Sequence, residues 1–252
     1  MQNKRQNICI AIDGYAGTGK SSLGKLLATD LNFCFLSTGS LYRAMAYKCL
    51  TNGVDVHDKQ QILDALKDTT VDIVFKDDTP YVVLNGQLIK EELLHTKEID
   101  ALTPFVAKHQ EIREKALFVQ RDLVKTKNIV LEGRDIGTVV APDAEIKLFF
   151  TASPEARAER RLQQHKESGE NVGYEEVLQN IIMRDFEDAN RKISPLKPAE
   201  DAVIIDTSHT TLQDTSKKIY GLVFNKMQQI LNSNSDIEVS ENLITLNSEK
   251  QM

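Results

Sequence analysis

Short β-branched and apolar runs recur along the chain between amphipathic stretches. They are ICIAID (8–13), FCFLS (33–37), IVLEG (129–133), IKLFFT (146–151) and AVIIDT (202–207). Runs of this length that are apolar on both faces are typical of strands buried in a parallel sheet, with helices covering each side. After the first run, residues 20–31 place apolar side chains at helical spacing, namely Leu23, Leu26, Leu27 and Leu31. The pattern predicts an α/β fold in which a β-loop-α unit opens the chain.

A different pattern follows over residues 51–125. Two strand-like runs, VDIVF (71–75) and YVVLNGQLI (81–89), are joined by a KDDTP turn without a helix between them, which predicts a small antiparallel insertion. Helix-like sequence returns over residues 97–125, where Pro104 is expected to start or break a helix.

The last third of the chain is more polar. Residues 154–191 are rich in charge around an ESGENVG segment, which predicts two helices joined by a flexible tip. Residues 228–252 lack sustained periodicity, which predicts a disordered polar tail without a role in chemistry. We therefore expect one domain over residues 1–227, with a core formed by residues 6–50, 126–153 and 192–227.

Composition excludes several classes of function. The 252 residues carry a formal net charge of −6, whereas general binders of nucleic acid or anionic membranes present a surplus of Lys and Arg. No apolar run is suited to a signal peptide or a transmembrane helix. Cys9, Cys34 and Cys49 lack metal or redox spacing and are expected to be reduced thiols in the interior. We expect a cytoplasmic protein that binds neither nucleic acid nor membrane, with its five histidines in surface segments.

A phosphate-binding loop follows the first predicted strand. The pattern GxxxxGK[ST] is matched by Gly14, Tyr15, Ala16, Gly17, Thr18, Gly19, Lys20 and Ser21, between a strand and a helix as the motif requires. Its backbone N–H groups and the helix N-terminus are suited to phosphate oxygens. Lys20 is expected to bridge the β- and γ-phosphates of a nucleoside triphosphate, and the Ser21 hydroxyl to ligate Mg²⁺.

The loop alone leaves open how the triphosphate is used. A guanine-reading [NT]KxD motif and the LSGGQ signature of transport ATPases are both absent from the sequence. Two classes stay open: a compact kinase, and a P-loop regulator in which the nucleotide only sets the conformation.

The number and placement of the arginines favour a kinase over a P-loop regulator. Eight lie in the segments around the predicted sheet edge: Arg43, Arg113, Arg134, Arg157, Arg160, Arg161, Arg184 and Arg191. Arg43 and Arg134 follow predicted strands, at the edge where open α/β sheets bind ligands. Arg184, Asp188 and Arg191 project from one face of a predicted helix. Fixed cations beside a P-loop suit phosphoryl transfer between two nucleotides, and an acceptor phosphate needs no general base because it is ionised at pH 7.

The motifs resemble the bacterial cytidylate kinase (CMP/dCMP kinase) family over most of the chain to about residue 225. The resemblance is carried by GYAGTGKSS, STGSLYRA, REKALFVQR, EGRDIGTVVAPDAEIKLFFTASPEARAERR and RDFEDANRKISPLKPAEDAVIIDTS. It implies a three-layer P-loop nucleoside monophosphate kinase (NMP kinase) with a five-stranded parallel sheet of order 2-3-1-4-5. It also implies an NMP-binding insertion of three short antiparallel strands (about 51–125) and a helical lid (about 154–191). The implied activity is phosphorylation of CMP and dCMP by ATP with Mg²⁺, in a monomer.

The resemblance assigns roles residue by residue. ATP is expected to be bound by Gly14, Tyr15, Ala16, Gly17, Thr18, Gly19, Lys20, Ser21 and Ser22, together with Arg157 and Arg161 of the lid. CMP is expected to be bound by Thr38, Arg43, Arg113, Arg134, Asp135, Arg184, Asp188 and Arg191. The implied catalytic residues are Lys20, Arg134, Arg161 and Arg184. Ser21 is expected to contact Mg²⁺ largely through water.

Four positions depart from the family pattern. Tyr15 stands where Pro is usual, Ser37 where Asp precedes Thr-Gly, and Glu132 where Asp precedes Gly-Arg-Asp. Pro104 stands where similar enzymes carry a Ser that contacts the base, with Thr103 beside it, and a Pro has no N–H to donate. A UMP kinase or another small-molecule P-loop kinase therefore stays open as an alternative.

Overall fold

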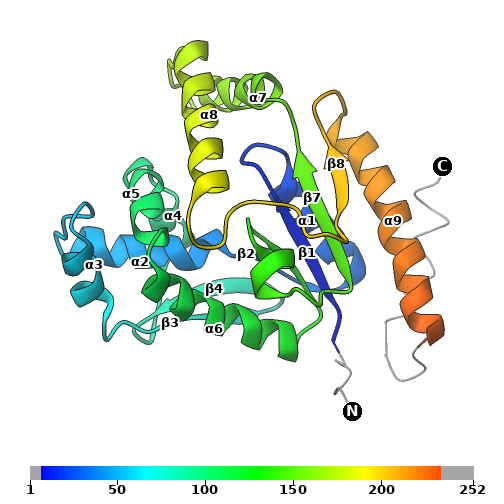
Figure 1. Cartoon of the computed structure of the whole chain (residues 1–252), viewed down its shortest axis with the longest axis horizontal. Coiled ribbons are helices and arrows are strands. Elements are labelled where there is room, and N and C mark those ends of the chain that lie inside the picture. The colour runs from blue at the N-terminus through cyan, green and yellow to red at the C-terminus, as the bar shows by residue number, and fades with distance from the viewer. Residues whose placement is uncertain (1–6, 234–252) are drawn as a thin grey trace.

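A five-stranded parallel sheet runs through the centre of the protein, whose computed structural model describes residues 7–233 (Figure 1). The strands are β1 (Cys9–Gly14), β2 (Cys34–Ser37), β6 (Ile129–Glu132), β7 (Ile146–Thr151) and β8 (Val203–Asp206). Their order in space is β2-β6-β1-β7-β8, with every neighbouring pair parallel. Counted within this sheet alone, this is the predicted order 2-3-1-4-5. The α/β fold class is therefore confirmed.

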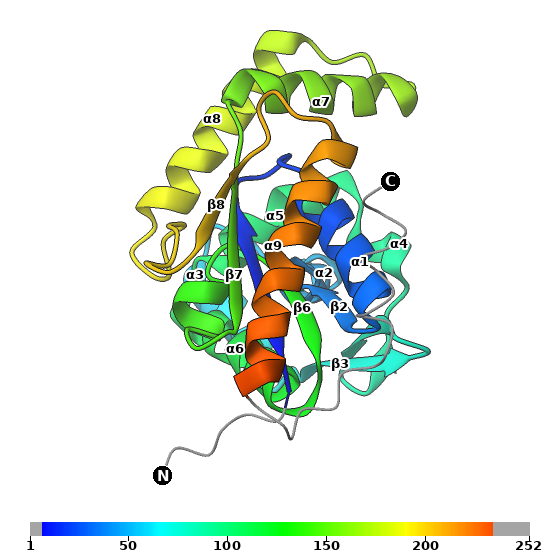
Figure 2. The ribbon, with the colours of Figure 1, turned by 90° about the vertical axis from the view of Figure 1, so that its right-hand side faces the viewer.

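Helices cover both faces of the sheet and give the three layers. They include α1 (Lys20–Leu31) and α9 (Leu212–Ser233) on one face, and α2 (Gly39–Thr51) and α6 (Gln110–Thr126) on the other. Successive residues of β1 alternate between these faces. Ile10 and Ile12 therefore pack with α1 and α9, which lie side by side in Figure 2, whereas Cys9 and Ala11 pack with α2 and α6.

The predicted leucine stripe of α1 is correct except at one position. Leu23, Leu27 and Leu31 are buried, but Leu26 is 40% exposed. The buried stripe extends instead through Gly24 and Ala28, which lie on the opposite side of Leu27 from Leu26.

The insertion forms a separate antiparallel sheet. Its strands are β3 (Val71–Lys76), β4 (Thr79–Leu84) and β5 (Gln87–Leu88), in that order. The run expected as one strand over 81–89 is two strands, because Asn85 and Gly86 adopt positive φ of 50° and 77° between β4 and β5. An Asn-Gly pair is a strong signal for such a two-residue turn.

Pro104 neither starts nor breaks a helix. The insertion also contains α3 (Lys59–Leu66), α4 (Glu91–Leu94) and α5 (Lys97–Ala107), and Pro104 lies inside α5. A proline removes one backbone hydrogen bond from a helix. Burial of Ile99 before Pro104 and of Val106 after it stabilises α5 despite this loss.

The charged segment forms two helices, α7 (Pro154–Glu167) and α8 (Tyr174–Asn190), as predicted. Figures 1 and 2 both place α7 beyond the carboxyl end of β7, and α8 leads from there back toward the sheet. The segment between the two helices contacts the insertion, where Lys97 Nζ lies 3.0 Å from a carboxylate oxygen of Glu170.

Helix α9 ends at Ser233, so the tail predicted from residue 228 is wrong for residues 228–233, which are helical. The helix packs on the sheet through Ile219, Val223 and Met227, spaced four residues apart. The rest of the predicted tail, residues 234–252, lies outside the described residues.

The expected burial of the three cysteines is confirmed. One histidine departs from expectation, because His109 is buried at the start of α6. Over the described residues 7–233, no helix is both long and apolar enough to cross a membrane.

Candidate active site

The phosphate-binding loop lies between β1 and α1, as predicted. A side chain at Gly14 would place its Cβ 2.0 Å from the Phe150 carbonyl oxygen, so only glycine permits this approach to β7. Gly19 precedes α1 with a φ of +87°. Tyr15 has a backbone N–H, which a proline at this position would lack. This N–H donates to the Phe150 carbonyl at 3.2 Å. Tyr15 therefore uses this N–H to tie the loop to β7.

Lys20 is buried beneath the loop. Its Nζ donates to the Tyr15 carbonyl at 2.5 Å and lies 3.8 Å from Glu132 Oε1. Burial first, and the positive charge of Arg134 next, lower the pKa of Lys20 to about 7. A bound polyphosphate would supply the missing negative charge.

Glu132, at the end of β6, accepts hydrogen bonds from hydroxyl groups of two other elements. Its Oε2 accepts from Ser37 Oγ at 2.6 Å and from Ser21 Oγ at 3.1 Å. Burial would raise the pKa of Glu132, but the cations Lys20 and Arg134 and the two hydroxyls outweigh it and hold the pKa below its usual value. Two of the positions that depart from the family pattern, Ser37 and Glu132, are thus direct partners.

A chain of alternating charges runs from the phosphate-binding loop to the predicted monophosphate side. Arg134 Nη1 lies 4.0 Å from Glu132 Oε1, and Arg134 Nε donates to Asp188 Oδ2 at 3.0 Å. Asp188 Oδ1 lies 3.5 Å from Arg191 Nη1.

The chain continues to α6. Arg191 Nη2 lies 3.8 Å from Asp135 Oδ1, and Arg113 Nη2 donates to Asp135 Oδ2 at 2.6 Å. Arg191 Nη2 is buried and, within residues 7–233, has no hydrogen-bond partner. A ligand acceptor would satisfy it.

Arg184 lies among other guanidinium groups. Its side chain keeps exposed surface, but loss of water around the guanidinium first, and then the charge of Arg134, lower the pKa of Arg184. The charges of Arg161 and Arg43 act in the same direction. The charges of Arg43, Arg134 and Arg161 therefore all act on Arg184, and Arg184 also acts on Lys20.

Several predicted site residues are engaged within the protein. Arg43 donates to Asp100 Oδ1 of α5 at 2.5 Å and 3.2 Å. Thr38 donates its hydroxyl to the Glu132 carbonyl at 2.9 Å. Exposed Arg161 contacts Gln164 at 3.4 Å. A nucleotide would have to compete with the Asp100 contact for Arg43.

Arg157 is placed differently from a solvent-facing lid arginine. It is 2% exposed and makes a bidentate pair with Asp185 of α8 at 2.9 Å and 2.5 Å. Its guanidinium carbon lies 5.2 Å from the Tyr15 ring centre, and Nη1 contacts the Ala16 carbonyl at 3.4 Å. Arg157 thus joins α7 and α8 to the phosphate-binding loop.

Three residues that organise the site had no role assigned from the sequence. Asp185 holds Arg157, and Arg160 donates to the Gly17 carbonyl and to Thr207 after β8. Asp13 binds the segment after β6. A carboxylate closing an otherwise apolar strand run was a signal for Asp13, since buried charges need partners.

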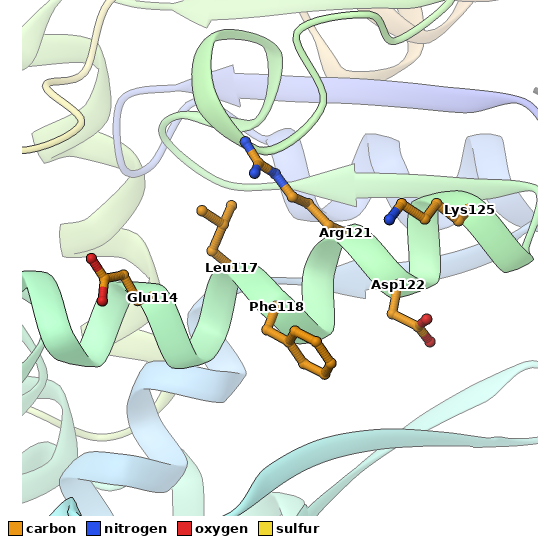
Figure 3. A pocket seen from close by; sticks show the side chains of 6 residues that line it. All are labelled: Glu114, Leu117, Phe118, Arg121, Asp122 and Lys125. Atoms are coloured by element: carbon orange, nitrogen blue, oxygen red, sulfur yellow. The ribbon is translucent and has the colours of Figure 1, made fainter. Parts of the chain in front are cut away.

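A separate depression of about 290 Å³ lies on α6. Figure 3 shows its lining along one stretch of the helix: Glu114, Leu117, Phe118, Arg121, Asp122 and Lys125. None of these is a predicted site residue, so this depression is distinct from the candidate active site.

A phosphate-binding loop that faces several guanidinium groups is arranged for two anionic substrates, so fold and site define the class of P-loop phosphotransferases. The family model described as cytidylate kinase matches residues 10–225, and the chain belongs to the cytidylate kinase family.

Named relatives agree with this assignment. A cytidylate kinase from Thermotoga neapolitana is 46% identical over 220 residues, covering 87% of this chain and 98% of that protein. A cytidylate kinase from Caldicellulosiruptor saccharolyticus is 39% identical over 219 residues, covering 87% and 96%. Among solved structures, a gluconokinase from Sinorhizobium meliloti 1021 has a TM-score of 0.46 at 14% identity, covering 92% of this chain and 100% of that one. That structural likeness carries no further conclusion.

Proposed function

We propose that the protein transfers the γ-phosphoryl group of ATP to CMP and dCMP, giving ADP and CDP or dCDP. The observation that carries the proposal is the alternating charge chain from Lys20 through Glu132, Arg134, Asp188, Arg191 and Asp135 to Arg113. It supports a second anion site opposite the phosphate-binding loop, in a chain related to cytidylate kinases.

The donor side is the loop from Gly14 to Ser22. Its N–H groups and Lys20 hold the ATP phosphates. Arg161, and Arg157 through its position against the loop, belong to the lid that closes on them and excludes water, which limits hydrolysis.

The acceptor side is arranged around three guanidinium groups. Arg43, Arg134 and Arg184 hold the CMP phosphate, and Asp188 accepts from the ribose hydroxyls. Thr38, Arg113, Asp135 and Arg191 surround the base. Cytosine offers an amino donor that suits the Asp135 carboxylate and acceptors that suit arginine.

The reaction is an in-line displacement. An ionised oxygen of CMP forms a bond to the γ-phosphorus, and the bond from this phosphorus to the β-γ bridging oxygen breaks, with its electron pair leaving on ADP. Lys20, Arg134, Arg161 and Arg184 stabilise the negative charge on the migrating group.

The residues present fit Mg²⁺, which the proposal includes. Ser21 Oγ, Ser37 Oγ and the Glu132 carboxylate form a group of oxygen atoms beside the loop, and Mg²⁺ takes oxygen ligands. Bound Mg²⁺ supplies neutralisation of charge on the β- and γ-phosphates. Ser21 would hold it, largely through water, and Glu132 would orient that water.

We extend the proposal to the organisation of the domain, which comprises a core, an NMP-binding insertion at about 51–125 and a lid at about 154–191. A monomer in the cytoplasm, without nucleic-acid or membrane partners, stays a prediction.

A coupled assay that measures ADP release tests the proposal, with CMP, dCMP, UMP and AMP as separate acceptors. Turnover with CMP and dCMP is expected. A rate with UMP about tenfold above that with CMP would overturn the base assignment, which corresponds to about 1.4 kcal/mol of transition-state preference. ATP binding without turnover of any monophosphate would support the regulatory class instead.

A further inference from the structure

Asp13 is a buried carboxylate at the point where β1 passes into the phosphate-binding loop. It is 4% exposed and directly precedes Gly14. Strand alternation places Asp13 on the same face of the sheet as Cys9 and Ala11, toward the segment that follows β6.

Both carboxylate oxygens of Asp13 accept from that segment. The Ile136 N–H donates to Oδ1 at 2.8 Å, and the Gly137 N–H donates to Oδ2 at 2.7 Å. These two residues begin the short helical turn η1 (Ile136–Val140). One carboxylate thus holds two consecutive N–H groups that lie more than a hundred residues away in the sequence.

The segment held by Asp13 carries the acceptor-side residues. Arg134 and Asp135 directly precede Ile136, and the Gly133 N–H donates to the Ile12 carbonyl of β1 at 2.9 Å. Three backbone N–H groups of the segment from Gly133 to Gly137 therefore form hydrogen bonds to the end of β1. The same strand end leads into the loop that holds ATP.

We propose that Asp13 is a positioning residue, whose ionised carboxylate sets the distance between the phosphate-binding loop and the acceptor-side residues Arg134 and Asp135. This inference rests on the proposed function. In-line transfer requires donor and acceptor within near-attack distance, and a displacement of about 1 Å can reduce the rate about 100-fold.

The charge of Asp13 is set by few groups. Lys20 of α1 favours the ionised form, and Asp135 opposes it. Lys147 of β7 packs beside Gly137, but its ammonium donates to the Pro142 carbonyl and to Asp201. Burial, only partly offset by the two N–H groups, raises the pKa of Asp13 to about 6.

The ionised form is therefore the major one above about pH 6. When Asp13 gains a proton, one oxygen becomes an O–H donor that opposes an N–H donor. One of its two contacts with η1 is then lost, and the acceptor segment is held less firmly.

Asp13→Asn tests this, because it keeps the shape, removes the charge and places an NH₂ group against an N–H. We expect kcat/KM for CMP to fall about 100-fold near pH 8. The ratio of wild-type to variant kcat/KM should then shrink several-fold between pH 8 and pH 5.5, with a midpoint near pH 6, because the wild type loses the same charge. Ionisation of the CMP phosphate affects both proteins and cancels in the ratio.

Asp58→Asn is a matched control, since Asp58 also accepts from two backbone N–H groups, those of Gln60 and Gln61 at 2.8 Å and 3.2 Å, at the start of α3. Its kcat/KM should equal that of the wild type at every pH. An Asp13→Asn ratio that stays constant with pH, or no loss at pH 8, would overturn the inference.

A second readout does not depend on activity. The ¹⁵N amide shifts of Ile136 and Gly137 should titrate with a midpoint near pH 6 in the wild type and not in Asp13→Asn. If the wild type phosphorylates no CMP, the proposed function fails while these shifts still test the contact. Amide shifts that do not titrate in the wild type would overturn the role of the Asp13 charge.

Discussion

The hydroxyl of Ser37 donates to Glu132 Oε2 at 2.6 Å and so links the ends of β2 and β6, which are paired in register at these two residues. Glu132 also accepts from Ser21 of α1 and lies near Lys20. Ser37 therefore orients the carboxylate that serves the phosphate-binding loop.

Ser37→Ala should disturb that carboxylate without removing it. A buried acceptor loses one donor, so we expect the free energy of unfolding to fall by about 1–2 kcal/mol and the KM for MgATP to rise several-fold. Mg²⁺ titrations of kcat/KM with each protein measure the second effect. Ser168→Ala is the control, since the Ser168 hydroxyl donates to the Gln164 carbonyl of the preceding helix α7. Equal kinetics of Ser37→Ala and wild type at all Mg²⁺ concentrations would contradict the role.

Lys20→Ala should abolish transfer to every acceptor. The change removes the cation expected to bridge the β- and γ-phosphates, and loss of such fixed charge costs about 10²–10³-fold or more in kcat. Single-turnover assays with CMP and with dCMP check this. A variant that retained wild-type kcat would place the donor phosphates elsewhere.

Asp188→Ala should act on the monophosphate side. Asp188 connects Arg134 and Arg191, so its removal frees both guanidinium groups from their shared partner. We expect the KM for CMP to rise about tenfold or more, with the KM for ATP nearly unchanged. Equal damage to ATP binding would show that α8 serves the donor instead.

The Arg157–Asp185 pair should contribute more to stability than to binding. Asp185→Ala leaves the buried Arg157 guanidinium without its carboxylate, which costs about 3–5 kcal/mol. At about 2–4 °C per kcal/mol, Tm should fall by roughly 6–20 °C. Calorimetry of Asp185→Ala and of the double variant with Arg157→Met separates the cost of an unpaired buried charge from the loss of the ion pair. The double variant buries no unpaired charge and should be more stable than the single one. A less stable double variant would contradict this account.

Asp13 should make stability depend on pH. Its pKa is raised from 3.8 to about 6, so its contribution is fully present below the unfolded pKa and is lost as pH rises through the folded pKa. This loss amounts to about 3 kcal/mol. The free energy of unfolding of Asp13→Asn minus that of the wild type should therefore rise by about 3 kcal/mol between about pH 3 and about pH 7.

Urea titrations across this pH range measure the difference. Asp58→Asn is again a useful contrast, because hydrogen bonds from Gln61 lower the pKa of Asp58, and its contribution is present above the unfolded pKa and lost as pH falls. If the difference in unfolding free energy between Asp13→Asn and the wild type does not change with pH, burial does not raise the pKa of Asp13.

Local patterns predicted the elements well where one interaction dominates. The five apolar runs became strands, and residues 20–31 became α1 with the predicted bounds. Burial on both faces is wrong for β8, which lies at the edge of the sheet and leaves Val203 and Ile204 exposed. Predictions failed where a weaker local signal competed with packing. Pro104 remains inside α5 because its neighbours Ile99 and Val106 are buried, and Asn85-Gly86 divides a run that appeared continuous.

By itself, the sequence determined the phosphate-binding loop, the sheet strands and the helix that carries Arg184 and Asp188, because each depends on residues within one or two elements. Arg191, predicted on the same helix face, follows α8 as its extended C-cap. Tertiary structure decided which distant groups meet: Ser37 with Glu132, Arg113 with Asp135, and Asp13 with Gly137. The physical reason is that these distances follow from strand order and crossover connections. Strand order is set by how the helices bury their apolar faces on the sheet, a property of the whole chain.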